Sequence, residues 1–327
     1  AALRSKDETS RECFVWRVNC VSTRFMTQPR PVNRGSTELT TRRCTQRSFL
    51  LNPEAVVNQI LLYVIAIIAD RYDVAVHAVC VMSSHIHTEL TDVEGQIPKF
   101  FQDAHSLIAR AVNAYYGRSE NLFAGGKQTG RVELIDEEAA LEKLVYIYTN
   151  PVAAGLVRHW GDWPGVVTPL CYRDLTIRVC KPDFFFRAKR WPEFVTLKIT
   201  PPPALAHLSP DELHERLTER IKLREAEIRD EMRRDGRRFL GAKRVLNQDP
   251  TTQAASEEAL FTMQPRVACK DPDRRKEWLR KRKEWLDRHR LAFEALRDGT
   301  SEDDVLFPEG SWKWVVLGGA KVERPPG

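Results

Sequence analysis

The amino-acid sequence predicts an α+β fold, in which helices pack on one face of a small antiparallel sheet. Three observations lead to this prediction. Strand-type and helix-type segments alternate along residues 35–151, in the order strand, helix, strand, helix, strand, helix. The helical segments are amphipathic or almost wholly apolar, so each has a face to bury against a sheet. A proline-rich break near residue 200 then leads into charged, mostly helical patterns.

The first strand and the first helix are predicted within residues 35–71. Residues 35–50 are rich in threonine, which favours a strand. Asn52 followed by Pro53 is a typical helix start, with Asn52 as the N-cap and Pro53 in the first helical position. The helix is then almost continuously apolar to about residue 71, so we expect it to pack deeply against the sheet.

The most informative stretch is residues 77–91, with the sequence HAVCVMSSHIHTELT. Its apolar and β-branched residues predict a β-strand. Because successive strand side chains point to opposite faces, His85 and His87 share one face and Ile86 points back into the core. Two imidazoles side by side on a strand suit a divalent-metal site, but such a pair also occurs as ordinary strand histidines. The pair alone leaves both interpretations open.

A second amphipathic helix is predicted over residues 97–118, followed by a glycine-rich turn and a strand within residues 122–135. Tyr115 and Tyr116, near the end of this helix, are interpreted as packing or stacking residues. The glycine-rich turn lacks the Walker pattern of a phosphate-binding loop, so it predicts no nucleotide site.

The third helix is predicted over residues 137–151, EEAALEKLVYIYTNP, and Pro151 is expected to end it. Four residues at helical spacing form its buried stripe: Leu141, Leu144, Val145 and Tyr148. Tyr146 lies off this stripe, and Asn150, four residues later, shares its face. A tyrosine and an amide placed in this way are either two exposed polar residues at a helix end or part of a site.

Together, these segments resemble the single-tyrosine HUH transposases, and most closely their REP-associated branch. The matching pieces are MSSHIH at residues 82–87, YIYTNPVAAGLV at 146–157 and DWPG at 162–165, within a similarity that covers roughly residues 30–185. The resemblance implies a ferredoxin-like antiparallel sheet. It also implies an enzyme that cleaves and rejoins single-stranded DNA next to a hairpin, formed by a palindromic repeat, through a 5′-phosphotyrosine intermediate.

The resemblance assigns roles to individual residues. His85, His87 and Asn150 would bind Mg²⁺ or Mn²⁺, and Tyr146 would be the nucleophile. Basic residues near the motifs are candidates for DNA contact; these are Arg42, Arg43, Arg47, Lys127 and Arg131. A solvated strand face for the first three, and an ordinary β-turn for the loop that carries the other two, are the alternative interpretations.

Two departures from the family pattern keep other functions open. Ser83-Ser84 stands where the family usually has a Pro-Asn pair, and Glu89, on the histidine face, replaces an apolar residue. One alternative is a catalytically inactive, domesticated DNA-binding protein that retains the fold. Another is a metalloenzyme with two histidines and one carboxylate, a ligand set that suits Fe²⁺, although it leaves Tyr146 and Asn150 unexplained.

The predicted organisation has three parts: an N-terminal arm at residues 1–30, the HUH nuclease and transposase domain at 31–199, and a charged, mostly helical extension at 200–327. In the extension, a capping box at residues 209–212 begins one helix, and a second is predicted over residues 271–297. The second helix is dense in cations, which are as compatible with DNA backbone contact as with a solvated face. The accessory DNA-binding candidates on it are Arg280, Lys281, Arg282 and Lys283.

The composition is compatible with these assignments. The net charge of +6 is compatible with a nucleic-acid partner. Seven scattered cysteines without a CxxC pair argue against a zinc ribbon or a disulfide framework. The longest apolar run, near residues 60–69, is too short to cross a bilayer, and the N-terminus has no signal-peptide pattern. We therefore expect a cytoplasmic protein without a membrane partner, acting as a monomer or dimer.

Overall fold

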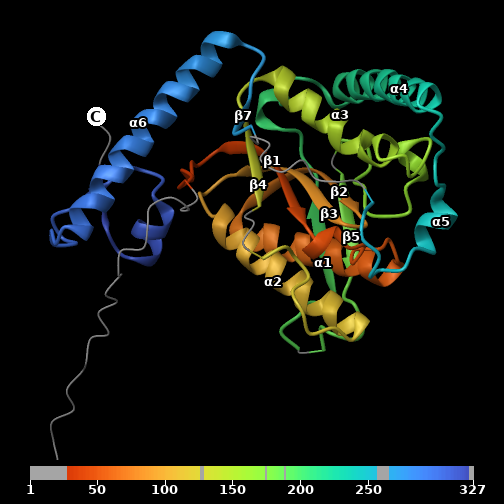
Figure 1. Ribbon diagram of the computed structural model, residues 1–327, viewed down its shortest axis with the longest axis horizontal. Coiled ribbons are helices and arrows are strands. Elements are labelled where there is room, and N and C mark those ends of the chain that lie inside the picture. Colours follow the sequence, from red (N-terminus) through yellow and green to blue (C-terminus); the bar gives the residue numbers. More distant parts are fainter. Residues whose placement is uncertain (1–27, 126–128, 174, 188, 256–264, 324–327) are drawn as a thin grey trace, which may run out of the picture. The chain divides into compact units, whose positions relative to one another are not determined.

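The centre of the structure is a mostly antiparallel sheet (Figure 1). The computed structural model describes residues 28–125, 129–173, 175–187, 189–255 and 265–323. In this part of the chain the sheet has the strand order β2-β3-β1-β4-β7. Its strands are β1 (Ser36–Arg43), β2 (Val74–Met82), β3 (His85–Asp92), β4 (Gly130–Leu134) and β7 (Val267–Ala268). Neighbours pair antiparallel except β4 and β7, which pair in parallel.

The connections follow a split βαβ pattern, in which each helix links two strands that have a third strand between them. Helix α1 (Ala55–Tyr72) connects β1 to β2, and α2 (Ile97–Tyr116) connects β3 to β4. Strands β1 and β3 therefore lie in the centre, with β2 and β4 on either side. This is the ferredoxin-like arrangement, and the predicted α+β class is confirmed.

Two sequence predictions about element boundaries are corrected. Residues 77–91 do not form one strand: β2 and β3 make a hairpin whose two-residue turn is Ser83-Ser84, with Met82 opposite His85. The first helix begins at Ala55, because the side chain of Asn52 is used elsewhere. The Asn52 amide donates to the backbone oxygens of Leu246 and Gln248, at 3.2 and 3.1 Å, instead of capping α1.

Helices cover both faces of the sheet, whereas the sequence predicted one. Helices α1 and α2 pack against each other on one face, and α3 (Glu137–Ala153) lies against β2 and β3 on the other (Figure 1). The reason is visible in β2 and β3, which are buried on both sides along nearly their whole length. A strand of this kind needs a cover on each face.

Helix α3 keeps the predicted stripe in the core and extends slightly further than expected. Leu141, Leu144 and Tyr148 are almost completely buried. The helix continues two residues past Pro151, because a proline in the last turn removes only one backbone hydrogen bond there. Ala154 N–H then closes the helix by donating to the Asn150 carbonyl at 2.9 Å.

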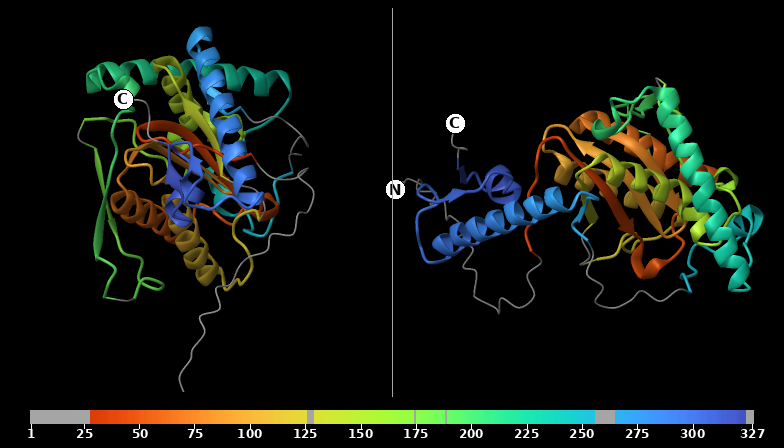
Figure 2. Two further views of the ribbon diagram at one scale, coloured as in Figure 1. Left: turned by 90° about the vertical axis from the view of Figure 1, so that its left-hand side faces the viewer. Right: turned by 90° about the horizontal axis from the view of Figure 1, so that it is seen from above.

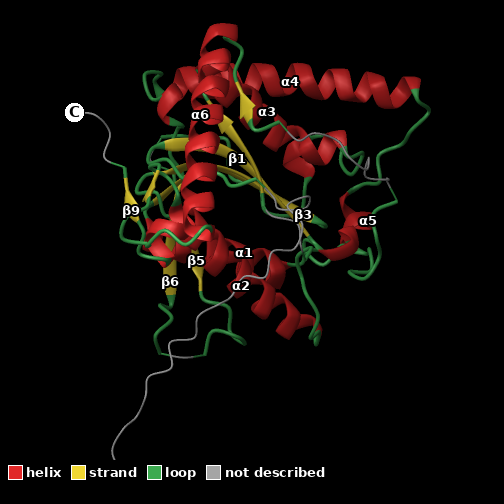
Figure 3. Cartoon of the chain, turned by 60° about the vertical axis from the view of Figure 1, so that its left-hand side comes forward, coloured by secondary structure: helices red, strands yellow, loops and turns green. Residues whose placement is uncertain are grey.

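The remaining elements surround this centre. Strands β5 (Thr176–Cys180) and β6 (Phe194–Lys198) form a hairpin that packs along α1 (Figure 2). Helix α6 (Pro272–Arg297) follows β7 at the sheet edge (Figure 3). The smaller elements are α5 (Ala242–Leu246), β8 (Leu306–Phe307), β9 (Lys321–Val322), the 3₁₀ turns η1 (Thr45–Arg47), η2 (Trp160–Asp162) and η3 (Pro203–Leu205), and the π-helical turn η4 (Lys313–Leu317).

Helix α4 (Pro210–Arg234) covers α3 and begins with the predicted capping box. Ion pairs join the two helices, between Arg216 and Glu137 at 3.1 Å and between Arg220 and Glu138 at 2.5 Å. Contacts thus cross the predicted boundary between residues 199 and 200, and the division into two parts stays a prediction. The predicted arm at residues 1–30 lies almost wholly outside the described residues.

The described helices do not meet the requirements of a membrane-spanning helix. None of them combines the length and the apolar character that crossing a bilayer requires.

The Asp136 carboxylate joins the start of α3 to the segment that leads into α6. One oxygen accepts from Ala139 N–H at 2.8 Å and caps α3. The other accepts from Cys269 Sγ and from the backbone N–H groups of Lys270 and Asp271, at 3.0, 2.6 and 3.1 Å. Burial alone would raise the pKa of Asp136, but these four donors hold it below its ordinary value.

We expect Asp136→Ala to lower the free energy of unfolding by about 2–4 kcal/mol, since it removes a helix cap and several charge-assisted hydrogen bonds. Because the folded-state pKa is lowered, this contribution is present above the ordinary value of 3.8 and is lost as pH falls through the folded pKa. Urea titrations at pH 7 and pH 3 would measure both effects. Asp249→Ala, which removes an exposed loop carboxylate, is the control; an equal loss in both variants would contradict the prediction.

Candidate active site

The structure brings together the four side chains that the resemblance placed in the site. His85 and His87 project from β3 toward α3, which supplies Tyr146 and Asn150. The imidazole centroids lie 4.6 Å apart, and the Tyr146 ring lies edge-on to His87 at 5.2 Å. Asn150 Nδ2 lies 3.3 Å from His87 Nε2. The same-face placement of each pair, predicted from strand and helix periodicity, is confirmed.

A hydroxyl group orients each imidazole. Thr41, opposite His87 in the β1–β3 register, places Oγ1 3.0 Å from His87 Nδ1. Ser84, in the hairpin turn, places Oγ 3.0 Å from His85 Nδ1. With the ring proton on Nδ1, each histidine donates to its hydroxyl and keeps the Nε2 lone pair available. Ser84, a departure from the family pattern, therefore has a supporting role.

Burial favours the neutral form of both histidines. Burial, followed by the charges of the nearby Arg43 and Arg47, lowers the pKa of His85 to about 4. Burial also lowers the pKa of His87 well below its ordinary value, followed by the effects of His85 and Arg43. Neutral imidazole is the form that binds metal ions.

The donor set suits a divalent metal ion. Two oriented imidazoles converge with the Asn150 side chain, which hydrogen-bonds His85 and lies beside His87. A half-turn of the Asn150 amide about its last torsion exchanges its nitrogen for an oxygen donor. Nδ1 atoms held by hydrogen bonds are the usual supporting pattern around metal-binding histidines.

Tyr146 differs from the other tyrosines of this region in what its hydroxyl faces. The residue is 42% exposed, whereas Tyr148 is fully buried and donates to the Pro169 carbonyl. The hydroxyls of Tyr115 and Tyr116 both donate to Glu54, at 2.7 and 2.8 Å. Partial burial raises the Tyr146 pKa, and the hydrogen bond from Asn150 and the charge of Arg43 act in the opposite direction. The phenol is therefore protonated at neutral pH.

Strand alternation separates the predicted DNA-binding cations of β1. Arg43 lies opposite His85 and acts on both the histidines and Tyr146. Arg47, in η1, also lies near His85. Arg42 points to the other face, where its guanidinium lies 5.3 Å from the centroid of the Phe123 ring. The structure thus brings Arg43 and Arg47 to the site, but not Arg42.

Another predicted DNA contact, Arg131, is engaged in an internal ion pair. Arg131 forms a bidentate ion pair with Glu38, with both distances at 2.5 Å, and only 13% of its side chain is exposed. This guanidinium therefore has an internal role, and its contact with DNA stays a prediction. Lys127 lies outside the described residues.

The accessory cations of α6 are mostly occupied within the helix. Arg280 pairs with Glu277 and Glu284, at 2.7 and 2.6 Å, and Lys281 pairs with Glu277 at 3.4 Å. Arg282 lies over the Trp278 ring at 5.6 Å. Lys283 is exposed on the same helix. The dense positive charge predicted for this face is therefore largely balanced.

Glu89 does not join the two histidines as a metal ligand. Its side chain is fully buried, and neither carboxyl oxygen has a hydrogen-bond partner among the described residues. Burial raises its pKa well above the ordinary value, although Lys143 lowers it slightly. Within the described ranges, no three His, Cys, Asp or Glu side chains gather around a common metal position. Among the described residues, Glu89 is therefore not placed as the carboxylate of the two-histidine alternative, which stays a prediction.

Sequence reasoning missed Thr41 and Ser84 as supporting residues. Thr41 carried no signal, because its contact with His87 depends on the pairing of β1 with β3. Ser84 could have been noticed, since a hydroxyl side chain immediately before a histidine in a turn can reach the ring.

Comparisons with known proteins give similarity at the level of the fold only. No protein-family model and no curated protein matches the sequence. Among solved structures, the chain is similar to a REP-associated tyrosine transposase bound to a REP hairpin, at 21% identity and a TM-score of 0.36, over 43% of this chain and 81% of that one. It is also similar to a candidate transposase from Deinococcus radiodurans R1, at 18% identity and a TM-score of 0.27, over 37% and 95%. Similarities at this level do not assign a function.

We expect Glu89→Gln to change the pH dependence of stability. The folded-state pKa of Glu89 is raised, so the native state holds a proton that the unfolded state has lost above the ordinary value of 4.5. Wild-type stability should fall relative to the variant by about 1.4 kcal/mol per pH unit until the folded pKa is reached. Denaturant titrations of both proteins from pH 5 to 9 would measure this, and parallel curves would contradict it.

Proposed function

We propose that this protein is a metal-dependent DNA transesterase of the transposase type. It cleaves and rejoins single-stranded DNA next to a hairpin, and Tyr146 is the nucleophile. One observation carries the proposal: an exposed tyrosine from α3 lies edge-on to the second of two oriented, neutral histidines on β3. The motif resemblance suggests the substrate class, and the geometry supports the assignment of a nucleophile beside a metal-binding histidine pair.

Tyr146 would carry out the covalent step. Its hydroxyl oxygen forms a bond to phosphorus, the bond from phosphorus to the 3′-oxygen breaks, and a 5′-phosphotyrosine and a free 3′-OH result. The phenol loses its proton, and the departing 3′-oxygen takes one up. Because no water enters, the same bond energy is available for rejoining to another 3′-OH. Arg43, which favours the phenolate form, lies where it would attract the phosphate.

His85, His87 and Asn150 would hold Mg²⁺ or Mn²⁺. When bound, the ion supplies a positive field that polarises a non-bridging phosphate oxygen and favours attack by a phenol of raised pKa. Thr41 and Ser84 fix the imidazole orientations before the ion arrives, so little rearrangement is needed.

Near the site, Arg43 and Arg47 would contact the DNA. The chemistry needs a phosphodiester that the exposed face of Tyr146 can reach, which favours a single strand beside a hairpin. The cations of α6 contribute less than their number suggests, since Arg280 and Lys281 are paired with acidic neighbours.

The alternative function is a catalytically inactive DNA-binding protein that retains the fold. Glu89 is the observation that favours it, because the family usually has an apolar residue in this position and the buried carboxyl has no partner among the described residues. Cleavage and adduct assays separate the two functions.

We expect Tyr146→Phe to form no covalent adduct with DNA while lowering stability by at most about 1 kcal/mol, since the ring is retained and only the hydroxyl and its hydrogen bond from Asn150 are lost. The assay incubates a 5′-tailed hairpin oligonucleotide with protein and Mn²⁺, resolves adducts on a denaturing gel and identifies the adduct peptide by mass spectrometry. Tyr148→Phe is the matched control, and should remain active with a stability loss of about 1 kcal/mol. An adduct on any residue other than Tyr146 would overturn the assignment. Tight hairpin binding by the wild type without an adduct would instead favour the inactive protein.

We expect Thr41→Val to weaken Mn²⁺ binding by about tenfold or more, because His87 loses the partner that fixes its tautomer and orientation. Isothermal titration calorimetry without DNA measures this directly. Thr40→Val is the control, since Thr40 also has a buried hydroxyl but pairs with Thr88, at 2.6 Å, away from the histidines. Equal Mn²⁺ affinity in both variants would sink the prediction.

A further inference from the structure

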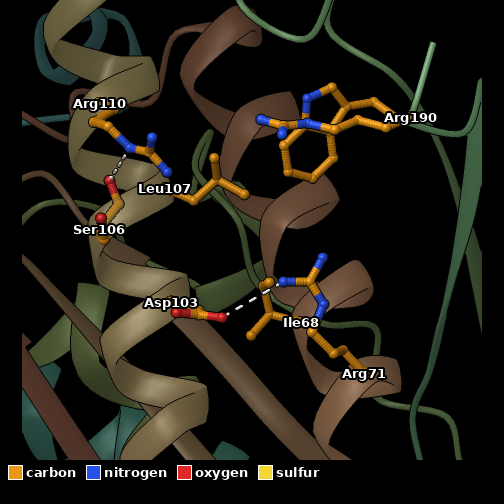
Figure 4. Close-up of a pocket in the computed structure, with 8 residues that line it drawn as sticks. Ile68, Arg71, Asp103, Ser106, Leu107, Arg110 and Arg190 are labelled. Atoms are coloured by element: carbon orange, nitrogen blue, oxygen red, sulfur yellow. Dashed lines mark hydrogen bonds and ion pairs between the residues drawn. The ribbon is translucent and has the colours of Figure 1, made fainter. Parts of the chain in front are cut away.

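A second polar pocket lies between α1, α2 and the loop that precedes β6 (Figure 4). Its volume is about 320 Å³. The residues that give it its character are Arg71, Asp103, Ser106, Arg110, Arg190 and Trp191. Since α1 and α2 cover the sheet face opposite α3, the pocket is separate from the histidine site.

The pocket carries an excess of positive charge. Asp103 is its one acidic lining residue, and its Oδ2 is already shared: it lies 3.5 Å from Arg71 Nη1 and accepts the Tyr72 hydroxyl at 2.6 Å. No carboxylate among the described residues lies within ion-pair distance of Arg110 or Arg190. Three guanidinium groups thus face one carboxylate, so the pocket attracts anions.

The guanidinium groups of Arg110 and Arg190 are placed for a shared ligand. Figure 4 shows them pointing toward each other across the pocket, with Leu107 between them. Arg110 Nε makes one long hydrogen bond, of 3.4 Å, to the Ser106 carbonyl, which leaves its two terminal nitrogens to face the pocket. The three arginines come from three separate segments: Arg71 from α1, Arg110 from α2 and Arg190 from the loop before β6.

An aromatic wall adjoins the charged groups. The Arg190 guanidinium lies 5.1 Å from the centroid of the Trp191 ring. Trp191 in turn packs edge-to-face on the buried Phe186, at 5.3 Å and 89°, which fixes its position. With Ile68 and Leu107 also in the lining, the pocket offers apolar surface next to its cations.

We propose that this pocket binds the phosphate group of a nucleotide, with the base against Trp191 and its apolar neighbours. Guanidinium groups match phosphate oxygens in charge and in bidentate geometry, and an aromatic ring offers a stacking surface that accepts any base. The volume is at the lower end of small-molecule sites, which suits a mononucleotide. The phosphate could belong to a free nucleotide or to a DNA strand. The proposal does not rest on the function assigned to Tyr146.

Calorimetric titration of the full chain with three probes tests the proposal: inorganic phosphate, deoxyadenosine 5′-monophosphate and a hairpin oligonucleotide. The test variant is Arg110→Gln combined with Arg190→Gln. The control combines Arg233→Gln and Arg234→Gln at the exposed end of α4, and removes the same charge. Circular dichroism and the melting temperature establish that both variants fold as the wild type does.

We expect the test variant to bind the mononucleotide at least about tenfold more weakly than the wild type and the control. Competition of that binding by inorganic phosphate would support recognition through the phosphate. If the mononucleotide fails to bind but the hairpin binds about tenfold more weakly to the test variant than to the control, the phosphate comes from a DNA strand. Equal affinities of the test and control variants for every probe, or no binding of any probe, would overturn the proposal. Because these are binding measurements, they stay interpretable if Tyr146 proves not to be a nucleophile.

Discussion

The site depends first on the register in which β1 pairs with β3. This register places Thr41 opposite His87 and Arg43 opposite His85, so one strand supplies the imidazoles and its neighbour supplies their hydrogen-bond partner and a cation. A slip of one residue would turn both histidines toward α1 and α2 and away from Tyr146. The buried Ile86, on the other face of β3, opposes such a slip, because its apolar side chain would then lie among the polar groups of the site.

Local periodicity was sufficient to predict which side chains share a face, whereas only the resemblance placed the two pairs in one site. That His85 and His87 share a face requires only the alternation of a strand, and that Tyr146 and Asn150 share one requires only the pitch of a helix. The β2–β3 hairpin was missed because Ser83-Ser84 has none of the glycine, asparagine or proline signals of a turn. The second covered face of the sheet was missed because burial on both sides is a tertiary property.

The DNA-binding candidates were also only partly predictable, because a sequence shows which residues are cationic but not which acidic residues pair with them. Arg131 and Glu38 lie 93 positions apart in the chain, so nothing local indicated their ion pair. Arg280 is different, since Glu277 and Glu284 lie one helical turn away on either side and helical spacing could have revealed both pairs. Counting cations therefore overestimated the positive charge that α6 offers to DNA.

Burial of titratable side chains determines how much charge the site carries. Burial keeps His85 and His87 uncharged, and it favours the protonated, uncharged form of Glu89 on the same face. A divalent ion held by these imidazoles and the Asn150 amide would keep its full charge, because no ligand neutralises it. Burying Glu89 has a desolvation cost that an apolar residue would avoid. As a neutral carboxyl, however, Glu89 adds no charge near Tyr146, so the electric field there would come from the metal ion and Arg43. The departure from the family pattern is thus compatible with catalysis as long as this carboxyl stays protonated.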